Sequence, residues 1–140
     1  MSAPTATGSC LCGAITFRID GPMRQVVSCH CSQCRKTTGH HVAATAAKKS
    51  DVTVTGTPSW YRSSELAERG FCPTCGSNLF WRGAEGGVHL SIWAGALDTH
   101  PEGLRTVWHI FCADKGRYYE ITDGLPQWDA GDDGPPDWIA

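Results

Sequence analysis

The sequence lacks the features that mark several large classes of protein. It has no apolar run near the ~20 residues of a transmembrane helix. Its formal net charge of −2 provides no basic surface for nucleic acid. The first residues, MSAPTATGS, show neither the charged nor the apolar region of a secretory signal. We therefore expect no nucleic-acid partner, no membrane partner and a cytoplasmic location, where thiols stay reduced.

A sustained 3.6-residue apolar period is also missing, so no long amphipathic helix is expected. Short apolar runs instead recur about every 8–12 residues between turn-forming residues, which is typical of an all-β domain. The chain has 140 residues and no visible linker or repeat, which predicts a single domain over 1–140. Residues 1–7 and 129–140 are expected to be loose tails. A homodimer is left open.

Strands are predicted where apolar and polar residues alternate or where short apolar runs lie between turns. In the first such segment, Ile15, Phe17 and Ile19 share one face. The predicted strands are 14–20, 25–28, 40–46, 52–55, 59–63, 78–82, 88–94, 106–112 and 118–121.

Two local connections are predicted between these strands. Gly56-Thr57-Pro58 is expected to join 52–55 and 59–63 as a hairpin. Residues Glu65 to Arg69 are expected to form one helical turn, which Gly70 ends.

The sequence has 8 cysteines, and seven of them fall into three tight groups. The groups are Cys10 and Cys12 in SCLCG, Cys29, Cys31 and Cys34 in CHCSQC, and Cys72 and Cys75 in FCPTCGS. Disulfides between such close neighbours would close small, strained rings. In a reducing compartment, C-x-C and C-x-x-C spacings favour metal ligands over disulfides.

The two cysteine pairs could together complete one metal site. In an extended chain, Cys10 and Cys12 point to the same face, and Cys72-Pro-Thr-Cys75-Gly is a knuckle. Four thiolates make a closed tetrahedral zinc site, and such sites are normally structural. The sequence does not prove this pairing, but it is the pairing that leaves three cysteines together.

Cys29, Cys31 and Cys34 form a group that is one ligand short of a tetrahedral zinc site. An open fourth position is typical of catalytic zinc, whereas a fourth protein ligand would make the site structural. On spacing alone both remain open. The candidates for a fourth ligand are His30, His40, His41, His109 and Cys112.

The charge of an open three-cysteine site favours one kind of chemistry. Zinc held by three thiolates carries a net negative charge and is a poor activator of water. The soft site suits another thiol, which zinc would deprotonate to a nucleophilic thiolate. Such a thiolate can add to a small aldehyde. Arg35 and Lys36 follow the last ligand and could offset the charge or hold a carboxylate of the thiol, or they are ordinary solvated charges.

These motifs resemble the glutathione-dependent formaldehyde-activating enzyme family, also called the Gfa or centromere-protein-V-like family. The resemblance runs from about Gly8 to Trp128. It is carried, in order, by the segments SCLCGAITF, CHCSQCRKTTG, RGFCPTCGSNLFW, AGALD and HIFCADKGRYYEITDGLPQW.

The resemblance implies a mainly β, zinc-binding fold like that shared by B-type methionine sulfoxide reductases and translationally controlled tumour protein. It implies two zinc ions per chain, and it matches Cys10, Cys12, Cys72 and Cys75 to structural ligands. It further implies that Cys29, Cys31 and Cys34 hold a catalytic zinc that is open to glutathione. The implied activity is that of a carbon–sulfur lyase that forms S-hydroxymethylglutathione from glutathione and formaldehyde.

The sequence departs from the family at one place that bears on substrate. Many members carry an aromatic residue after the Arg-Lys-x-x-Gly segment, where this chain has His40 and His41, which we expect near the thiol substrate. Two alternatives to the lyase are a non-enzymatic, zinc-stabilised binding module and a zinc hydrolase acting on C=N bonds.

Overall fold

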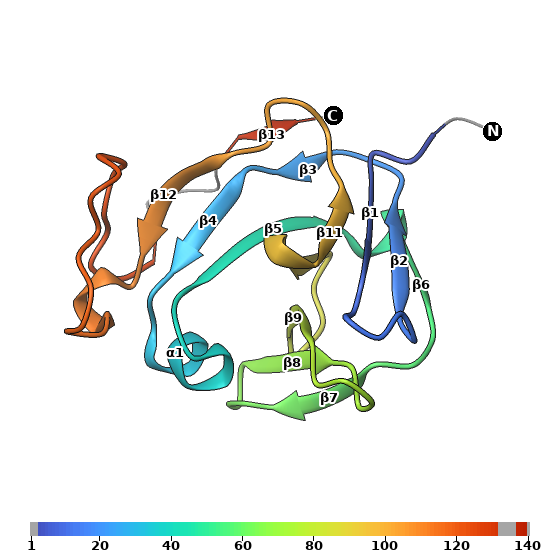
Figure 1. Ribbon diagram of the computed structural model, residues 1–140, viewed down its shortest axis with the longest axis horizontal. Coiled ribbons are helices and arrows are strands. Elements are labelled where there is room, and N and C mark those ends of the chain that lie inside the picture. Colours follow the sequence, from blue (N-terminus) through green and yellow to red (C-terminus); the bar gives the residue numbers. More distant parts are fainter. Residues whose placement is uncertain (1–2, 132–136, 140) are drawn as a thin grey trace.

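The computed structural model describes residues 3–131 and 137–139, which fold into short strands with little helix (Figure 1). The helical elements of the described residues are α1 (Ser32–Thr38), η1 (Lys49–Asp51), η2 (Ala94–Ala96) and η3 (Cys112–Asp114). The strands are β1 (Ala6–Ser9), β2 (Thr16–Ile19), β3 (Met23–Arg24), β4 (Val26–Cys29), β5 (Val42–Lys48), β6 (Val52–Thr55), β7 (Ser59–Arg62), β8 (Ala67–Phe71), β9 (Asn78–Gly83), β10 (His89–Trp93), β11 (Leu97–Thr99), β12 (Thr106–Ile110) and β13 (Trp138–Ile139). The predicted mainly β class is confirmed.

The strands form one large and two smaller sheets. The seven-stranded sheet has the order β12-β4-β5-β10-β9-β8-β7, and the four-stranded sheet has the order β11-β1-β2-β6. Strands β13 and β3 form a two-stranded sheet. Neighbouring strands are antiparallel except β12 and β4, which are parallel. The predicted domain of short antiparallel strands is therefore what the structure contains.

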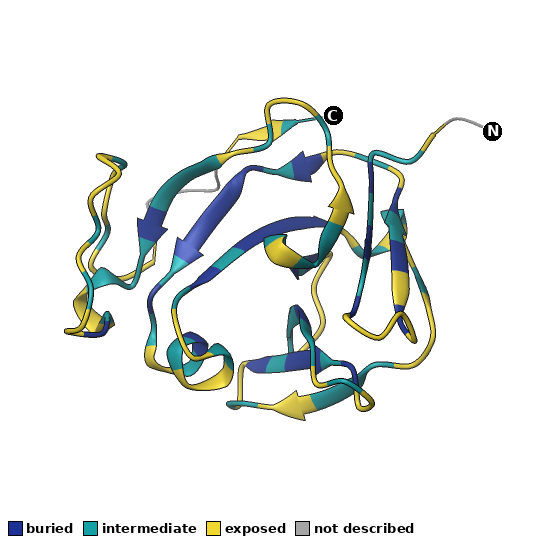
Figure 2. Cartoon of the chain, in the orientation of Figure 1, coloured by how far each residue is buried: buried dark blue, intermediate teal, exposed yellow. Residues whose placement is uncertain are grey.

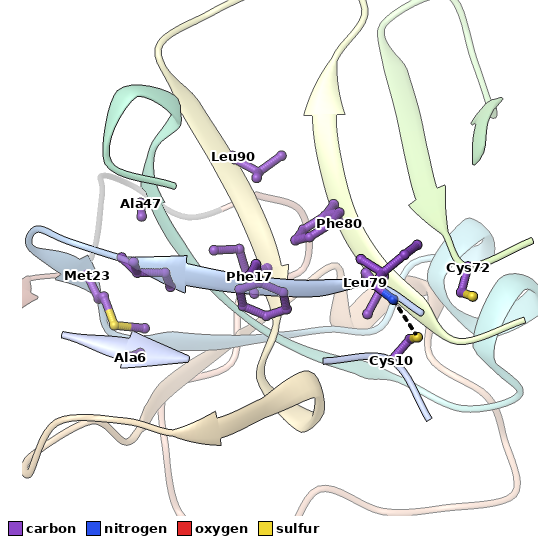
Figure 3. Packing of buried hydrophobic residues seen from close by; sticks show 12 residues of the cluster. Ala6, Cys10, Phe17, Met23, Ala47, Cys72, Leu79, Phe80 and Leu90 are labelled. Atoms are coloured by element: carbon purple, nitrogen blue, oxygen red, sulfur yellow. Dashed lines mark hydrogen bonds between the residues drawn. The ribbon is translucent and has the colours of Figure 1, made fainter. Parts of the chain in front are cut away.

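The main core lies where the four-stranded sheet meets β9 and β10 of the larger sheet. The predicted alternation around β2 is confirmed, because Ile15, Phe17 and Ile19 are all buried. The Phe17 ring meets the Phe80 ring edge-on at 5.3 Å between centroids (Figure 3). Burial of each such side chain contributes roughly 1.5–3 kcal/mol to folding.

The strand β4, helix α1 and strand β5 run consecutively and carry the CHCSQC segment at their junction (Figure 1). Both strands are largely buried, whereas the outer face of the helix is exposed (Figure 2). The helix was not predicted. Its N-cap is Cys31, which is not one of the usual Ser, Thr, Asp or Asn signals, and Gly39 ends it in the left-handed conformation at φ 90°.

Three predicted elements are wrong. Residues 65–69 do not form a helical turn, because 67–71 pair with β7 and β9 as strand β8. Residues 52–55 and 59–62 are strands but not a hairpin, since β6 pairs with β2 and β7 with β8. Residues 118–121 are not a strand. In the first two cases long-range pairing overrides the local signal.

The two ends of the chain make more contacts than loose tails would. Ala6 is buried and begins β1, and Trp138–Ile139 pairs with β3 as β13. Residues 1–2, 132–136 and 140 lie outside the described residues. In the described part of the chain, no helix is long and apolar enough to cross a membrane.

Candidate metal centres

The first cysteine group joins two segments that are far apart in sequence. The Sγ atoms of Cys10, Cys12, Cys72 and Cys75 all lie within 4.8 Å of one another. Cys10 and Cys12 follow β1, and Cys72 and Cys75 lie between β8 and β9. The structure therefore brings together the two pairs that the sequence suggested, with four sulfurs that could hold one metal ion.

Backbone N–H groups and one serine hold these sulfurs in place. The N–H of Ile15 donates to Cys10 Sγ at 3.3 Å, and the N–H of Cys75 lies 3.5 Å from Cys72 Sγ. Gly76 has φ +80°, which lets its N–H donate to the Cys72 carbonyl at 2.8 Å and closes the knuckle. Ser77 Oγ lies 3.2 Å from Cys75 Sγ, and this contact, with the backbone N–H groups of Ser77 and Cys12, lowers the pKa of Cys75 to about 5.

This four-cysteine cluster borders the main core. Cys10 and Cys72 are buried among the core residues, next to Leu79 (Figure 3), whereas Cys12 is exposed. Four sulfurs complete a tetrahedral ligand set and leave no position for a substrate. The arrangement therefore fits a structural metal ion.

The second cysteine group is local. Cys29 ends β4, Cys31 caps α1, Cys34 lies in the first turn of α1, and their three Sγ atoms lie within 4.8 Å of one another. Cys34 forms a buried cluster with Val42 and Ala44, and Cys29, Cys31 and Trp93 pack against it. Cys34 is buried, and the other two are half-buried. These three sulfurs could also hold a metal ion.

Hydrogen bonds within the three-cysteine cluster favour a thiolate. The side chains of Cys29 and Cys34, with backbone N–H groups of the helix, hold the pKa of Cys31 far below its ordinary value. One of these N–H groups, that of Cys34, donates to Cys31 Sγ at 3.3 Å. The same sharing of protons, together with burial, raises the pKa of Cys29. A metal ion would replace the shared protons.

None of the candidate fourth ligands joins this cluster in the described part of the chain. His30 turns away from the sulfurs and lies in a buried network: its Nδ1 is 2.5 Å from Tyr119 Oη and its Nε2 is 2.9 Å from His109 Nδ1. His109 Nε2 in turn lies 2.7 Å from Asp123 Oδ2. Burial and neighbouring histidines lower the pKa of His30 to about 4, so this imidazole is neutral near pH 7. The described protein atoms thus supply three of four tetrahedral ligands.

The family model of the glutathione-dependent formaldehyde-activating enzymes matches residues 5–114, which include all seven clustered cysteines. The chain belongs to this family. A curated relative, an uncharacterized lyase of Schizosaccharomyces pombe, is 33% identical over 79 residues, which are 56% of this chain. The chain spans only 58% of the length of that relative.

A solved crystal structure also resembles this family member. A Rhodobacter sphaeroides protein shares 23% sequence identity and aligns with a TM-score of 0.58. The alignment covers 74% of this chain and 98% of that chain. At this identity the likeness shows a shared fold.

Of the four residues predicted to contact the thiol substrate of this Gfa-family chain, two lie on helix α1 and two follow it directly. Arg35 Nε donates to the Asp114 carbonyl at 3.1 Å, Lys36 is exposed, and His40 Nδ1 lies 2.5 Å from Tyr118 Oη. Asp114 ends η3 and Tyr118 follows it, so these two contacts join the segment after β12 to the helix and to the residue after its C-cap. Substrate contacts by Arg35, Lys36 and His40 stay predictions.

His41, the fourth of these residues, lines an open groove of about 720 Å³. The groove runs from the four-cysteine cluster, at Cys10, to Val42 and Trp93, which belong to the hydrophobic packing around Cys34. His41 Nδ1 and Trp93 Nε1 are buried and have no hydrogen-bond partner among residues 3–131 and 137–139. The groove thus gives a small molecule room next to Val42 and Trp93, the residues that pack around Cys34.

The sequence did not predict one residue that contacts the three-cysteine cluster. The buried guanidinium of Arg69, on β8, donates from Nη1 to Cys34 Sγ at 3.7 Å. Arg69 lies 35 residues from Cys34. The expected helical turn at 65–69 hid the alternation of Ala67 and Arg69 toward the interior, which was the signal that could have found it.

Proposed function

We propose that this chain is a zinc-dependent carbon–sulfur lyase. In this proposal Cys29, Cys31 and Cys34 hold a catalytic zinc, and a thiol substrate, glutathione by the family's name, adds to formaldehyde or a related small aldehyde. The observation that carries the proposal is the convergence of three sulfurs with no fourth ligand among the described residues. A second zinc, held by Cys10, Cys12, Cys72 and Cys75, is proposed to be structural.

The reaction is an addition without net oxidation. The thiol sulfur forms a bond to the carbonyl carbon, the carbonyl π bond breaks, and the thiol proton ends on the former carbonyl oxygen. When bound, zinc would supply a Lewis-acidic position that lowers the pKa of the thiol. No described residue completes the ligand set of Cys29, Cys31 and Cys34, and the groove that His41 and Trp93 line offers room for the peptide-like body of a thiol such as glutathione.

The catalysed rate must be measured against the spontaneous rate, because glutathione and formaldehyde also combine without a catalyst. Exchange spectroscopy by NMR can measure the interconversion of glutathione and S-hydroxymethylglutathione at equilibrium, with and without protein. We expect the protein to accelerate exchange and Cys31→Ser to abolish the acceleration. Cys112→Ser is the matched control, since Cys112 belongs to neither cluster. Equal acceleration by a folded Cys31→Ser protein would overturn the proposal.

A zinc hydrolase acting on C=N bonds is the second candidate, and one observation favours it. The guanidinium of Arg69 contacts Cys34 Sγ and offsets the negative charge that makes a three-thiolate zinc a poor activator of water. Turnover of an imine or amidine substrate without any added thiol would favour the hydrolase. The binding module is favoured if the wild-type protein shows neither activity and added thiols do not bind its second metal ion.

A further inference from the structure

Arg69 is a buried cation without a carboxylate partner in the described structure. Its side chain comes from β8, and the residue is only 6% exposed. The guanidinium donates from Nη1 to Cys34 Sγ at 3.7 Å, from Nη2 to Gln33 Oε1 at 3.3 Å and from Nε to Ser63 Oγ at 3.2 Å. The ion pairs of the described residues involve other cations, namely Arg18, Arg82 and His109.

A buried cation is costly unless an anion compensates it. The groups that Arg69 contacts are an amide, a hydroxyl and a cysteine sulfur, so the cysteine alone can carry a negative charge. Zinc with three thiolates carries one net negative charge, which one guanidinium balances. The surroundings of Cys34 therefore fit an anionic metal–thiolate centre better than three neutral thiols.

The four-cysteine cluster is held differently. Its sulfurs contact backbone N–H groups and the neutral hydroxyl of Ser77, as described above. Arg69 thus distinguishes the two clusters, because it places a fixed cation beside the three-cysteine cluster.

We infer that Arg69 is a positioning residue of the three-cysteine metal centre, whose guanidinium balances the charge of the metal-bound thiolates and holds Cys34 Sγ by a charge-assisted hydrogen bond. The centre is then nearly neutral before a substrate binds, which allows an anionic thiolate to enter as the fourth ligand. The inference rests on the zinc of the proposed function, but not on the lyase reaction.

The competing explanation is that Arg69 merely ties β8 to α1. In that case its bonds to Gln33 and Ser63 matter as much as its contact with Cys34. Gln33→Ala and Ser63→Ala each remove one of those bonds and keep the charge. If Arg69 acts through charge, both variants retain zinc at the three-cysteine cluster.

The test measures the metal centre itself. Zinc affinity is measured by competition with a chromophoric chelator, and cobalt substitution reports the sulfur-to-metal charge-transfer band. Arg69→Met should weaken zinc binding at the three-cysteine cluster about 10–100-fold, as is usual for residues that support metal ligands. It should also move the cobalt band to lower energy, because Cys34 loses a hydrogen bond. Arg69→Lys should weaken binding less, since it keeps the charge but not the planar fork.

Arg82→Met is the matched control. Arg82 lies on the neighbouring strand β9, pairs with Glu68 and stacks on Trp60, so its loss removes an arginine and an ion pair whose recorded partners include no cysteine. It should leave zinc affinity and the cobalt band unchanged. A folded Arg69→Met protein whose zinc affinity and cobalt band match those of Arg82→Met overturns the inference.

If Arg69→Met does not fold, Arg69→Lys and Arg82→Lys are compared instead. A weaker zinc affinity in Arg69→Lys alone supports the inference, and equal affinities overturn it. The two proposals fail in different ways. A wild-type protein that binds two metal ions but shows no lyase activity refutes the reaction and leaves the role of Arg69 intact. Failure to bind a second metal ion refutes both.

Discussion

Both cysteine clusters offer thiolate ligands, but they differ in how far apart in the sequence their cysteines lie. The four-cysteine cluster joins segments 60 residues apart, one after β1 in the four-stranded sheet and one after β8 in the seven-stranded sheet. The three-cysteine cluster lies within six residues at the junction of β4 and α1. By a loop-closure model, the first closure restricts the unfolded chain by about 4 kcal/mol and the second by about 2 kcal/mol.

In this chain the cluster with more ligands is also the one whose cysteines lie farther apart in the sequence. A metal ion that joins two sheets gains from being fully enclosed, because its binding energy is folding energy. A metal ion held by one short segment adds less to folding and can leave a position open. The first cluster is thus suited to stability and the second to binding.

The largest expected effect is that of Cys72→Ser. Cys72 is fully buried at the edge of the main core, and its loss breaks the closed site that links the two sheets. We expect insoluble protein without cooperative unfolding, measured by the soluble fraction and by thermal circular dichroism. A soluble Cys72→Ser protein that unfolds cooperatively would show that this cluster is not the structural one.

The next effect in size is that of Cys34→Ser. Because the three-cysteine cluster is local, we expect the protein to stay folded and to lose one of two zinc ions per chain. Elemental analysis of protein purified under reducing conditions measures the zinc, and circular dichroism checks the fold. Cys112→Ser should keep both ions. Loss of both ions from a folded Cys34→Ser protein would contradict the independence of the clusters.

A smaller difference between the clusters is expected in how fast each one releases its metal ion from the wild-type protein. A chelator should remove zinc in two kinetic phases, first from the three-cysteine cluster, whose open position gives access. The melting temperature should change little after the first phase and fall strongly after the second. Cys31→Ser should lack the fast phase. A single phase that unfolds the protein as zinc leaves would mean that both sites are structural.

The sequence predicted the parts of the fold and site that depend on local spacing. The alternation of Ile15, Phe17 and Ile19 is a property of one strand, and the C-x-C and C-x-x-C spacings by themselves predict metal ligands. The family resemblance then implied a role for each cluster, and the match of the family model over residues 5–114 confirms the family.

The parts that sequence did not predict depend on long-range pairing. Residues 59–62 pair with 67–71, so the expected hairpin partner was wrong. The same strand pairing positions Arg69 beside Cys34. The contact of Tyr119 with His30 likewise spans 89 residues. No local pattern encodes which side chain from a distant strand will face a cluster.

The smallest predicted effect concerns pH and His41, which lines the same groove as Val42 and Trp93. Burial and neighbouring histidines lower the pKa of His41 below its ordinary value of 6.5. The titratable groups around its ring are His30, His40, Tyr119, His109 and Asp123. As the pH falls below 6.5, the unfolded chain binds a proton at His41 before the folded chain does, so stability declines with acidity.

His41→Gln should therefore reduce the fall in melting temperature between pH 6.5 and about 5.5, measured with zinc in excess so that the metal sites stay filled. The exposed His100 is the matched control, and His100→Gln should leave the slope unchanged. Equal slopes in the two variants would mean that His41 takes up its proton as readily in the folded as in the unfolded chain. The surroundings of the His41 ring would then be more hydrated than the burial of His41 Nδ1 implies.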